Sequence, residues 1–186
     1  MQPKSISRRD FVRGSALGGG AVLLGIAGGT LQAQPARASY QDGWAYCSKC
    51  KGMFYESEGA GRCPGTQGHN ARLSEYYEID YDIHTNYVWQ DRWWHCKKCQ
   101  GLHYKNTNPF GQCPAGGFHT NEGSHNYVLY HGTDIPPQTP GIQYAWAHCK
   151  RCQGLHYLPE LPRSKCPAGG QHTGEGSYDY VLAYRV

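Results

Sequence analysis

Cysteines and histidines recur in this chain at spacings typical of metal ligands. Three times, a Cys-x2-Cys pair is followed, after 12 or 13 intervening residues, by a third cysteine and, after five more, by a histidine. The three sets are Cys47, Cys50, Cys63 and His69; Cys96, Cys99, Cys113 and His119; and Cys149, Cys152, Cys166 and His172.

Three thiolates and one imidazole form a closed tetrahedral environment for zinc, and a two-residue gap lets both thiolates of a pair face one ion from a single turn. We therefore predict about three zinc ions per chain. Four protein ligands leave no open coordination position, so these sites are predicted to be structural and not catalytic. Gly52, Gly101 and Gly154 each follow a second cysteine by two residues, and we expect them to adopt a positive φ and direct backbone N–H groups at the sulfurs.

Disulfides and iron are the alternatives to zinc. Nine cysteines are an odd number, and three per set cannot pair internally, whereas metal ligation uses every cysteine by the same rule in each set. Iron is the minor alternative ion, because no set has the fourth cysteine of a rubredoxin-type site. Zinc best explains both the spacing of the ligands and the odd number of cysteines.

The ligand sets lie within three repeats of about 50 residues. WAYCSKCKGMFY, WWHCKKCQGLHY and WAHCKRCQGLHY are followed by CPGTQGH, CPAGGFH and CPAGGQH, and each copy then reaches a tyrosine that opens an apolar stretch. We place the repeats at about 40–86, 87–140 and 141–186. Such a regular period indicates a repeat architecture.

Alternation around the first cysteine of each repeat indicates a strand. Trp44, Trp93 and Trp146 stand three residues before a cysteine, so they share one face with the residue directly before that cysteine, while the cysteine turns to the other face. The three tryptophans are predicted to lie in the core. Other short segments rich in Tyr, Val and Leu also read as strands.

These features predict an all-β protein, specifically a pseudo-threefold β-trefoil built from the three repeats. Radial repetition removes the open edges of a sheet, and we expect the C-terminal YVLAYRV to pair with the first strand of the chain. Three tandem zinc-ribbon-like modules are the alternative.

The N-terminal segment has the character of an export signal. Ser7-Arg8-Arg9-Asp10-Phe11 precedes a glycine-rich apolar stretch and Ala36-Arg37-Ala38, a small-x-small cleavage site, which together resemble a twin-arginine signal peptide. The apolar run is too short and too rich in glycine for a membrane anchor. We therefore predict a signal at 1–38 and one domain at 39–186, secreted or periplasmic, with no membrane span in the mature form.

Charge and motifs exclude several function classes. The predicted signal holds five of the 18 basic and one of the 14 acidic residues, which leaves 13 of each in the mature chain, so the basic excess expected of a nucleic-acid-binding protein is missing. There is no G-x-S-x-G, H-E-x-x-H or phosphate-binding glycine loop, and we predict no enzyme activity and no catalytic residues.

The remaining histidines and tryptophans are expected to pack or to lie at the surface. His95 and His148 stand where the first repeat has Tyr46, and His103 and His156 stand where it has Phe54. This interchange with aromatic rings favours packing or surface roles over metal ligation. Trp89 and Trp94 are not repeated and are the better candidates for exposed aromatic surface, although one-off packing is the simpler explanation.

The combined pattern WxxCxxCxGLxY…CPAGGxH…GSxxYxL resembles a tandem repeat of secreted bacterial proteins. The second and third repeats match it throughout, whereas the first has CPGTQG and Leu73-Ser74 in place of CPAGG and Gly-Ser. The β-trefoil fold suggests a binding module. We therefore predict a secreted, zinc-stabilised, non-enzymatic and lectin-like protein whose partner is a carbohydrate or cell-surface component. A structural or self-assembling extracellular protein is the alternative, and a secreted enzyme or inhibitor is third.

Overall fold

A computed structural model describes residues 39–83, 85–105, 111–134 and 141–186. The predicted signal at 1–38 lies outside these residues. No helix in the described part of the chain is long and apolar enough to cross a membrane.

The described residues form nine strands and two short 3-10 helices, so the all-β prediction is confirmed. Each repeat contributes a long strand, a three-residue strand and a returning strand. In chain order the strands are β1 (Ser39–Tyr46), β2 (Met53–Tyr55), β3 (Tyr76–Tyr81), β4 (Trp89–His95), β5 (Leu102–Tyr104), β6 (Tyr127–Tyr130), β7 (Ile142–His148), β8 (Leu155–Tyr157) and β9 (Tyr180–Tyr184). The helices are η1 (Glu56–Glu58) and η2 (Leu158–Arg163).

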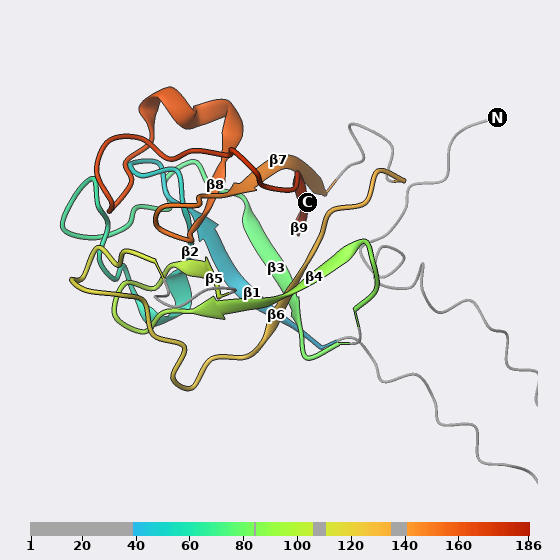
Figure 1. Cartoon of the computed structure of the whole chain (residues 1–186). Coiled ribbons are helices and arrows are strands. Elements are labelled where there is room, and N and C mark those ends of the chain that lie inside the picture. The colour runs from blue at the N-terminus through green and yellow to red at the C-terminus, as the bar shows by residue number, and fades with distance from the viewer. Residues whose placement is uncertain (1–38, 84, 106–110, 135–140) are drawn as a thin grey trace, which may run out of the picture.

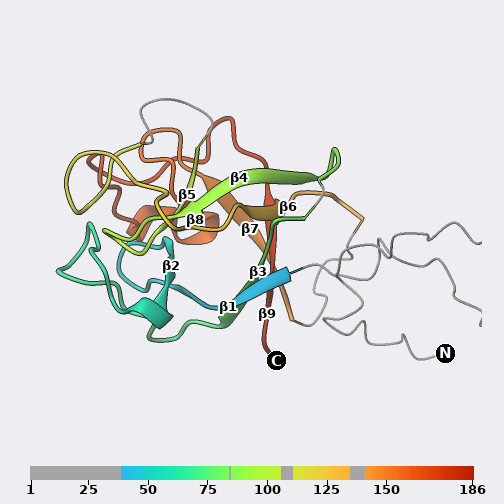
Figure 2. The same cartoon turned by 90° about the horizontal axis from the view of Figure 1, so that it is seen from below.

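All nine strands belong to one antiparallel sheet that nearly closes on itself. Within each repeat the long strand pairs with both of its partners, as β1 does with β2 and β3. The returning strands β3, β6 and β9 also pair with one another. The short strands β2, β5 and β8 contact each other and lie together beside the long loops (Figures 1 and 2). Strands of different repeats therefore share one sheet, as isolated ribbon modules would not.

Each long strand carries an irregularity just before its tryptophan. The pairing register shifts between Gln41 and Trp44, and at the equivalent place in β4 and β7. A residue with positive φ lies at each shift: Gly43, Arg92 and Ala145, at 84°, 65° and 64°. Such bulges bend a strand and increase its twist, which helps a sheet to close.

The core draws equally on the three repeats. Its buried members fall into equivalent triplets: Trp44, Trp93 and Trp146; Met53, Leu102 and Leu155; Tyr77, Tyr127 and Tyr180; and Ile79, Leu129 and Leu182. Each indole packs edge-to-face on a tyrosine of another repeat, with ring centroids 5.0 Å apart for Trp44 and Tyr127, a favourable aromatic geometry. The prediction that the three tryptophans are core residues is confirmed, since all three are fully buried.

Buried tyrosines also link the repeats by hydrogen bonds. Tyr77 Oη donates to Gln143 Oε1 over 2.5 Å, and the equivalent Tyr127 and Tyr180 hydroxyls donate to Gln41 and Gln90. Burial raises the pKa of all three phenols above their ordinary range, so each remains a protonated donor. The three bonds form a cycle that ties every repeat to both others.

The expected pairing of the C-terminal strand with the first strand is wrong. β9 pairs with β3 through Tyr77–Tyr184 and Glu78–Ala183, and with β6 and β7; no β1–β9 pairing occurs among the described residues. The returning strands β3, β6 and β9 pair with one another, so the strand of the first repeat that meets β9 is β3. The two ends of the domain still meet through side chains, because Arg185 forms an ion pair with Asp42.

Removing one phenol of this cycle is expected to destabilise the fold. In Tyr77→Phe the half-buried Gln143 Oε1 loses its donor, which should lower the free energy of unfolding by about 1 kcal/mol. Tyr76→Phe is the matched control, since Tyr76 is 56% exposed, and it should change stability little. Urea denaturation of both variants measures the difference; equal effects would contradict a structural role for the cycle.

Candidate metal centres

The structure gathers each predicted ligand set into one cluster. In every set the three sulfurs and the histidine nitrogen lie within 4.8 Å of one another. The first and third sulfurs are 3.8, 4.0 and 3.9 Å apart in the three clusters, and the second sulfur lies 3.4, 3.5 and 3.4 Å from histidine Nδ1.

These separations fit a tetrahedral zinc ion. Zn–S bonds of about 2.3 Å at tetrahedral angles place two sulfurs about 3.8 Å apart. A disulfide instead requires an S–S distance of about 2.05 Å, and all nine cysteines are free and buried. The chain therefore offers three Cys3His sites, which accommodate about three zinc ions.

A tight turn presents the first two sulfurs of each cluster. In the second repeat, Cys96 N donates to Gly101 O over 3.0 Å and Gln100 N donates to Cys96 O over 2.7 Å, and the other two repeats form the same pair of bonds. The turn connects the long strand to the short one, so strand pairing aims both thiolates at one point.

The predicted positive φ at the glycines of this turn is wrong. It falls one residue earlier, on Lys51, Gln100 and Gln153, with φ of 69°, 64° and 63°. These long side chains reach back to the carbonyl three residues before them, as Gln100 Nε2 does to Lys97 O over 3.2 Å, which supports the left-handed backbone. The glycine contributes its N–H, since Gly101 N donates to Cys99 Sγ over 3.4 Å.

A second turn presents the third sulfur. In CPAGG, Gly116 N donates to Cys113 O over 3.0 Å, and Cys113 N donates to Gly117 O over 2.9 Å. Both glycines have positive φ, a conformation that glycine adopts without steric cost. The first repeat lacks this sequence, and there Gly65 N donates to Cys63 Sγ over 3.4 Å. The ligand set is thus retained although the turn differs.

An aromatic ring stacks on each ligand histidine. Phe54 lies on His69, His103 on His119 and His156 on His172, with centroids 4.5–4.7 Å apart and planes within 16°. Burial lowers the pKa of both His103 and His156 to about 3, so these rings are neutral. Their predicted packing role is confirmed, and the interchange with Phe54 was the signal for it.

The ligand side chains are electrostatically coupled. Contacts with Cys113 and Cys99 hold the pKa of Cys96 well below its usual range, whereas contacts with Cys113 and Cys96 raise that of Cys99. Burial opposes protonation of His119, but its contacts with Cys113 and Cys96 outweigh this and raise its pKa to about 9. A divalent cation therefore competes with protons for a buried, negatively charged cluster, and its binding releases them.

Each metal centre is also braced by a neighbouring repeat. Tyr55 N, Tyr104 N and Tyr157 N donate to the carbonyls of Gln100, Gln153 and Lys51, over 2.8, 2.7 and 3.0 Å. Gly111, from the second repeat, packs closely on the Cys-x2-Cys turn of the third repeat: a Cβ at Gly111 would lie 2.3 Å from Cys152 O. The three clusters are thus connected in a ring by backbone contacts.

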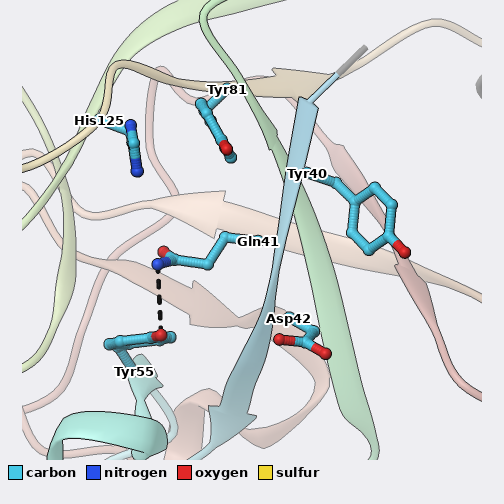
Figure 3. A pocket seen from close by; sticks show the side chains of 6 residues that line it. All are labelled: Tyr40, Gln41, Asp42, Tyr55, Tyr81 and His125. Carbon is cyan, nitrogen blue, oxygen red and sulfur yellow. Dashed lines mark hydrogen bonds between the residues drawn. The ribbon is translucent and has the colours of Figure 1, made fainter. Parts of the chain in front are cut away.

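A pocket of about 380 Å³ lies away from the metal centres, at the junction of the first two repeats. We call it the junction pocket; its lining residues are Tyr40, Gln41, Asp42, Tyr55, Tyr81 and His125 (Figure 3). Sequence analysis did not find it, because the residues come from separate segments. The aromatic residues singled out instead are half-buried: Trp89 packs on Tyr130 and Trp94 lies under the ammonium of Lys105.

Comparisons with protein-family models, with curated proteins and with solved structures find no match for this chain.

Zinc content tests the metal centres directly. Protein purified without chelator is expected to contain about three zinc ions per chain, and His119→Ala about two, whereas the matched variant of its exposed neighbour, Phe118→Ala, should keep all three. EDTA should lower the Tm, because metal binding and folding are coupled. Elemental analysis and thermal unfolding give the readouts; disulfides in a metal-free protein would contradict the assignment.

Two glycine variants separate the bracing contact from backbone strain. Gly111 and Gly116 both have positive φ, but only at Gly111 would a Cβ clash, since nothing lies within 4 Å of the one at Gly116. Gly116→Ala should therefore cost about 1–2 kcal/mol through its backbone alone. Gly111→Ala should cost about 1–3 kcal/mol more through overpacking. Urea denaturation compares them, and equal costs would mean that the neighbouring repeat does not brace the turn.

Proposed function

We propose that this protein is an exported, zinc-stabilised, non-enzymatic binding protein of the β-trefoil type with a lectin-like function. The observation that carries the proposal is the closed character of the three Cys3His clusters. Every cysteine is used in holding the chain together, and four protein ligands leave no position for a substrate. Zinc then serves to make a rigid scaffold whose function lies on its surface.

The threefold pattern of strand pairing supports the β-trefoil type. Each repeat supplies a strand hairpin and a returning strand, the three returning strands pair with each other, and the three short strands meet at the other end of the sheet. The resemblance of the repeats to those of secreted bacterial proteins agrees with this assignment.

The environment of Asp80, the carboxylate that most resembles a catalytic acid, is consistent with a non-enzymatic function. Burial, followed by the charge of Glu78, raises the pKa of Asp80 to about 6, the kind of shift that can mark a catalytic acid. Asp80, however, lines a space of only about 10 Å³, which is enclosed by Trp89 and by residues of the returning strands β3, β6 and β9. A substrate does not fit there, so Asp80 is best explained as a buried residue of the sheet.

Export by the twin-arginine route is consistent with these metal centres. Proteins on that route fold in the cytoplasm, where thiols stay reduced, and nine buried thiols need such conditions to bind zinc before they can be oxidised. The proposed location of the mature protein is therefore the periplasm or the cell exterior, where polysaccharides are available as ligands.

Retention on immobilised polysaccharides tests the proposal. A panel of chitin, cellulose, xylan and starch is matched with the uncoated resin, and the zinc-loaded protein is expected to be retained on at least one polysaccharide. Assays of the eluted polysaccharide for new reducing ends should show no cleavage. Absence of retention on the whole panel, together with concentration-dependent polymers in light scattering, would favour the self-assembling alternative and sink the lectin-like function.

A further inference from the structure

The junction pocket has the polar groups of a ligand site held in fixed orientation. Tyr127 Oη, from the second repeat, donates to Gln41 Oε1, and Gln41 Nε2 donates to Tyr55 Oη over 3.2 Å. Both polar atoms of the Gln41 amide are therefore engaged by tyrosine hydroxyls, which hold the amide plane in one orientation. These two bonds also fix the directions of the second N–H hydrogen of Gln41 Nε2 and of the Tyr55 hydroxyl. Groups that are already oriented lower the entropy cost of binding a ligand.

Figure 3 shows how these groups face the pocket. Gln41, Tyr55, Tyr81 and His125 project to the same side of β1, whereas Tyr40 and Asp42 lie on its opposite side. The alternation of a strand explains this difference between Tyr40 and Gln41. Four side chains from four separate segments therefore converge on one space.

Two stacked rings form the wall opposite Tyr55. Tyr81 and His125 lie face to face, with centroids 3.9 Å apart and planes 21° apart, and His125 Nδ1 lies 3.5 Å from Asp82 Oδ2. His125 belongs to the second repeat and Tyr81 to the first. The wall exists only because the two repeats meet, and its rings are held by each other and by Asp82.

The charges around the pocket disfavour an anionic ligand. Asp42 lines it, and Asp82 lies directly behind His125. The guanidinium of Arg185 is shared between Asp42 and Glu78, so its charge is compensated. Phosphate or carboxylate ligands would therefore meet net negative charge. Amide, phenol and imidazole groups beside aromatic faces suit a neutral ligand with many hydroxyls and an apolar face.

We propose that the junction pocket binds one pyranose unit of a neutral polysaccharide, with the Tyr81–His125 wall contacting the apolar face of the ring, and with the Gln41 amide and the Tyr55 hydroxyl hydrogen-bonding its hydroxyls. This inference rests on the proposed lectin-like function and assigns a site to it. The pocket volume lies within the range of small-molecule sites, which are typically about 300–1,000 Å³.

The chain supplies a matched control for this site. Tyr178 occupies in the third repeat the position of His125 in the second, and its ring stacks on His131 with a centroid distance of 3.9 Å. Tyr178 is 54% exposed and the His125 side chain 45% exposed. His125→Ala and Tyr178→Ala therefore each remove one exposed, stacked ring at a repeat junction, but only the first lies in the junction pocket.

Titration calorimetry with chitohexaose, cellohexaose, xylohexaose and maltohexaose measures affinity for soluble fragments of the same four polysaccharides. For the hexasaccharide that the unaltered protein binds, His125→Ala should weaken binding at least tenfold, while Tyr178→Ala should leave it within twofold. His125→Phe, which keeps a stacking ring, should recover most of the affinity. Three zinc ions per chain in every variant establish that the fold is intact.

The outcomes separate the two proposals. Retention of the unaltered protein on a polysaccharide, with equal affinities for the unaltered protein and His125→Ala, overturns the assignment of the site and leaves the lectin-like function standing. Equal weakening by His125→Ala and Tyr178→Ala overturns it as well, because binding would then be a property of all junctions. If no polysaccharide or hexasaccharide binds, the proposed function itself fails.

Discussion

Coordination of one ion by a tight turn and a distant loop is the constraint on which the local structure of each repeat depends. Between β5 and β6, for example, no described residue lies in a helix or strand, yet this stretch must place Cys113 and His119 beside Cys96 and Cys99. Closing such a loop costs chain entropy. The buried apolar residues of this cluster are the three cysteines, so metal binding must supply much of the compensating free energy.

The long strands couple these local clusters to the common core. Because side chains alternate along a strand, Trp44 faces the core shared by all repeats, whereas Ala45 and Cys47 belong to the cluster of their own metal site. The same seven or eight residues thus serve two separate interiors. Displacing a strand would disturb both at once, which explains why backbone hydrogen bonds from neighbouring repeats converge on the turns that carry the cysteines.

Repetition made much of this structure predictable. The ligand sets and the core tryptophans follow from spacing and alternation, which are local properties. The left-handed residue of the turn was misplaced, because its conformation depends on how far the Gln100 side chain can reach. The partner of β9 was misassigned because pairing across repeats depends on how the returning strands meet, which no local sequence pattern shows. The junction pocket was missed for a related reason: His125 has no marked sequence pattern, and its position beside Tyr81 exists only after two repeats pack.

The tyrosine–glutamine hydrogen bonds are the same at all three junctions between repeats. Only two of these junctions, however, lie between repeats that follow each other in the chain. At the third junction, Tyr77 of the first repeat donates a hydrogen bond to Gln143 of the third. Arg185, near the last strand, forms an ion pair with Asp42 of the first strand. Connectivity is therefore not what holds the ring together. The same architecture is therefore open to circular permutation, because equivalent contacts would hold a break in the chain at any of the three junctions.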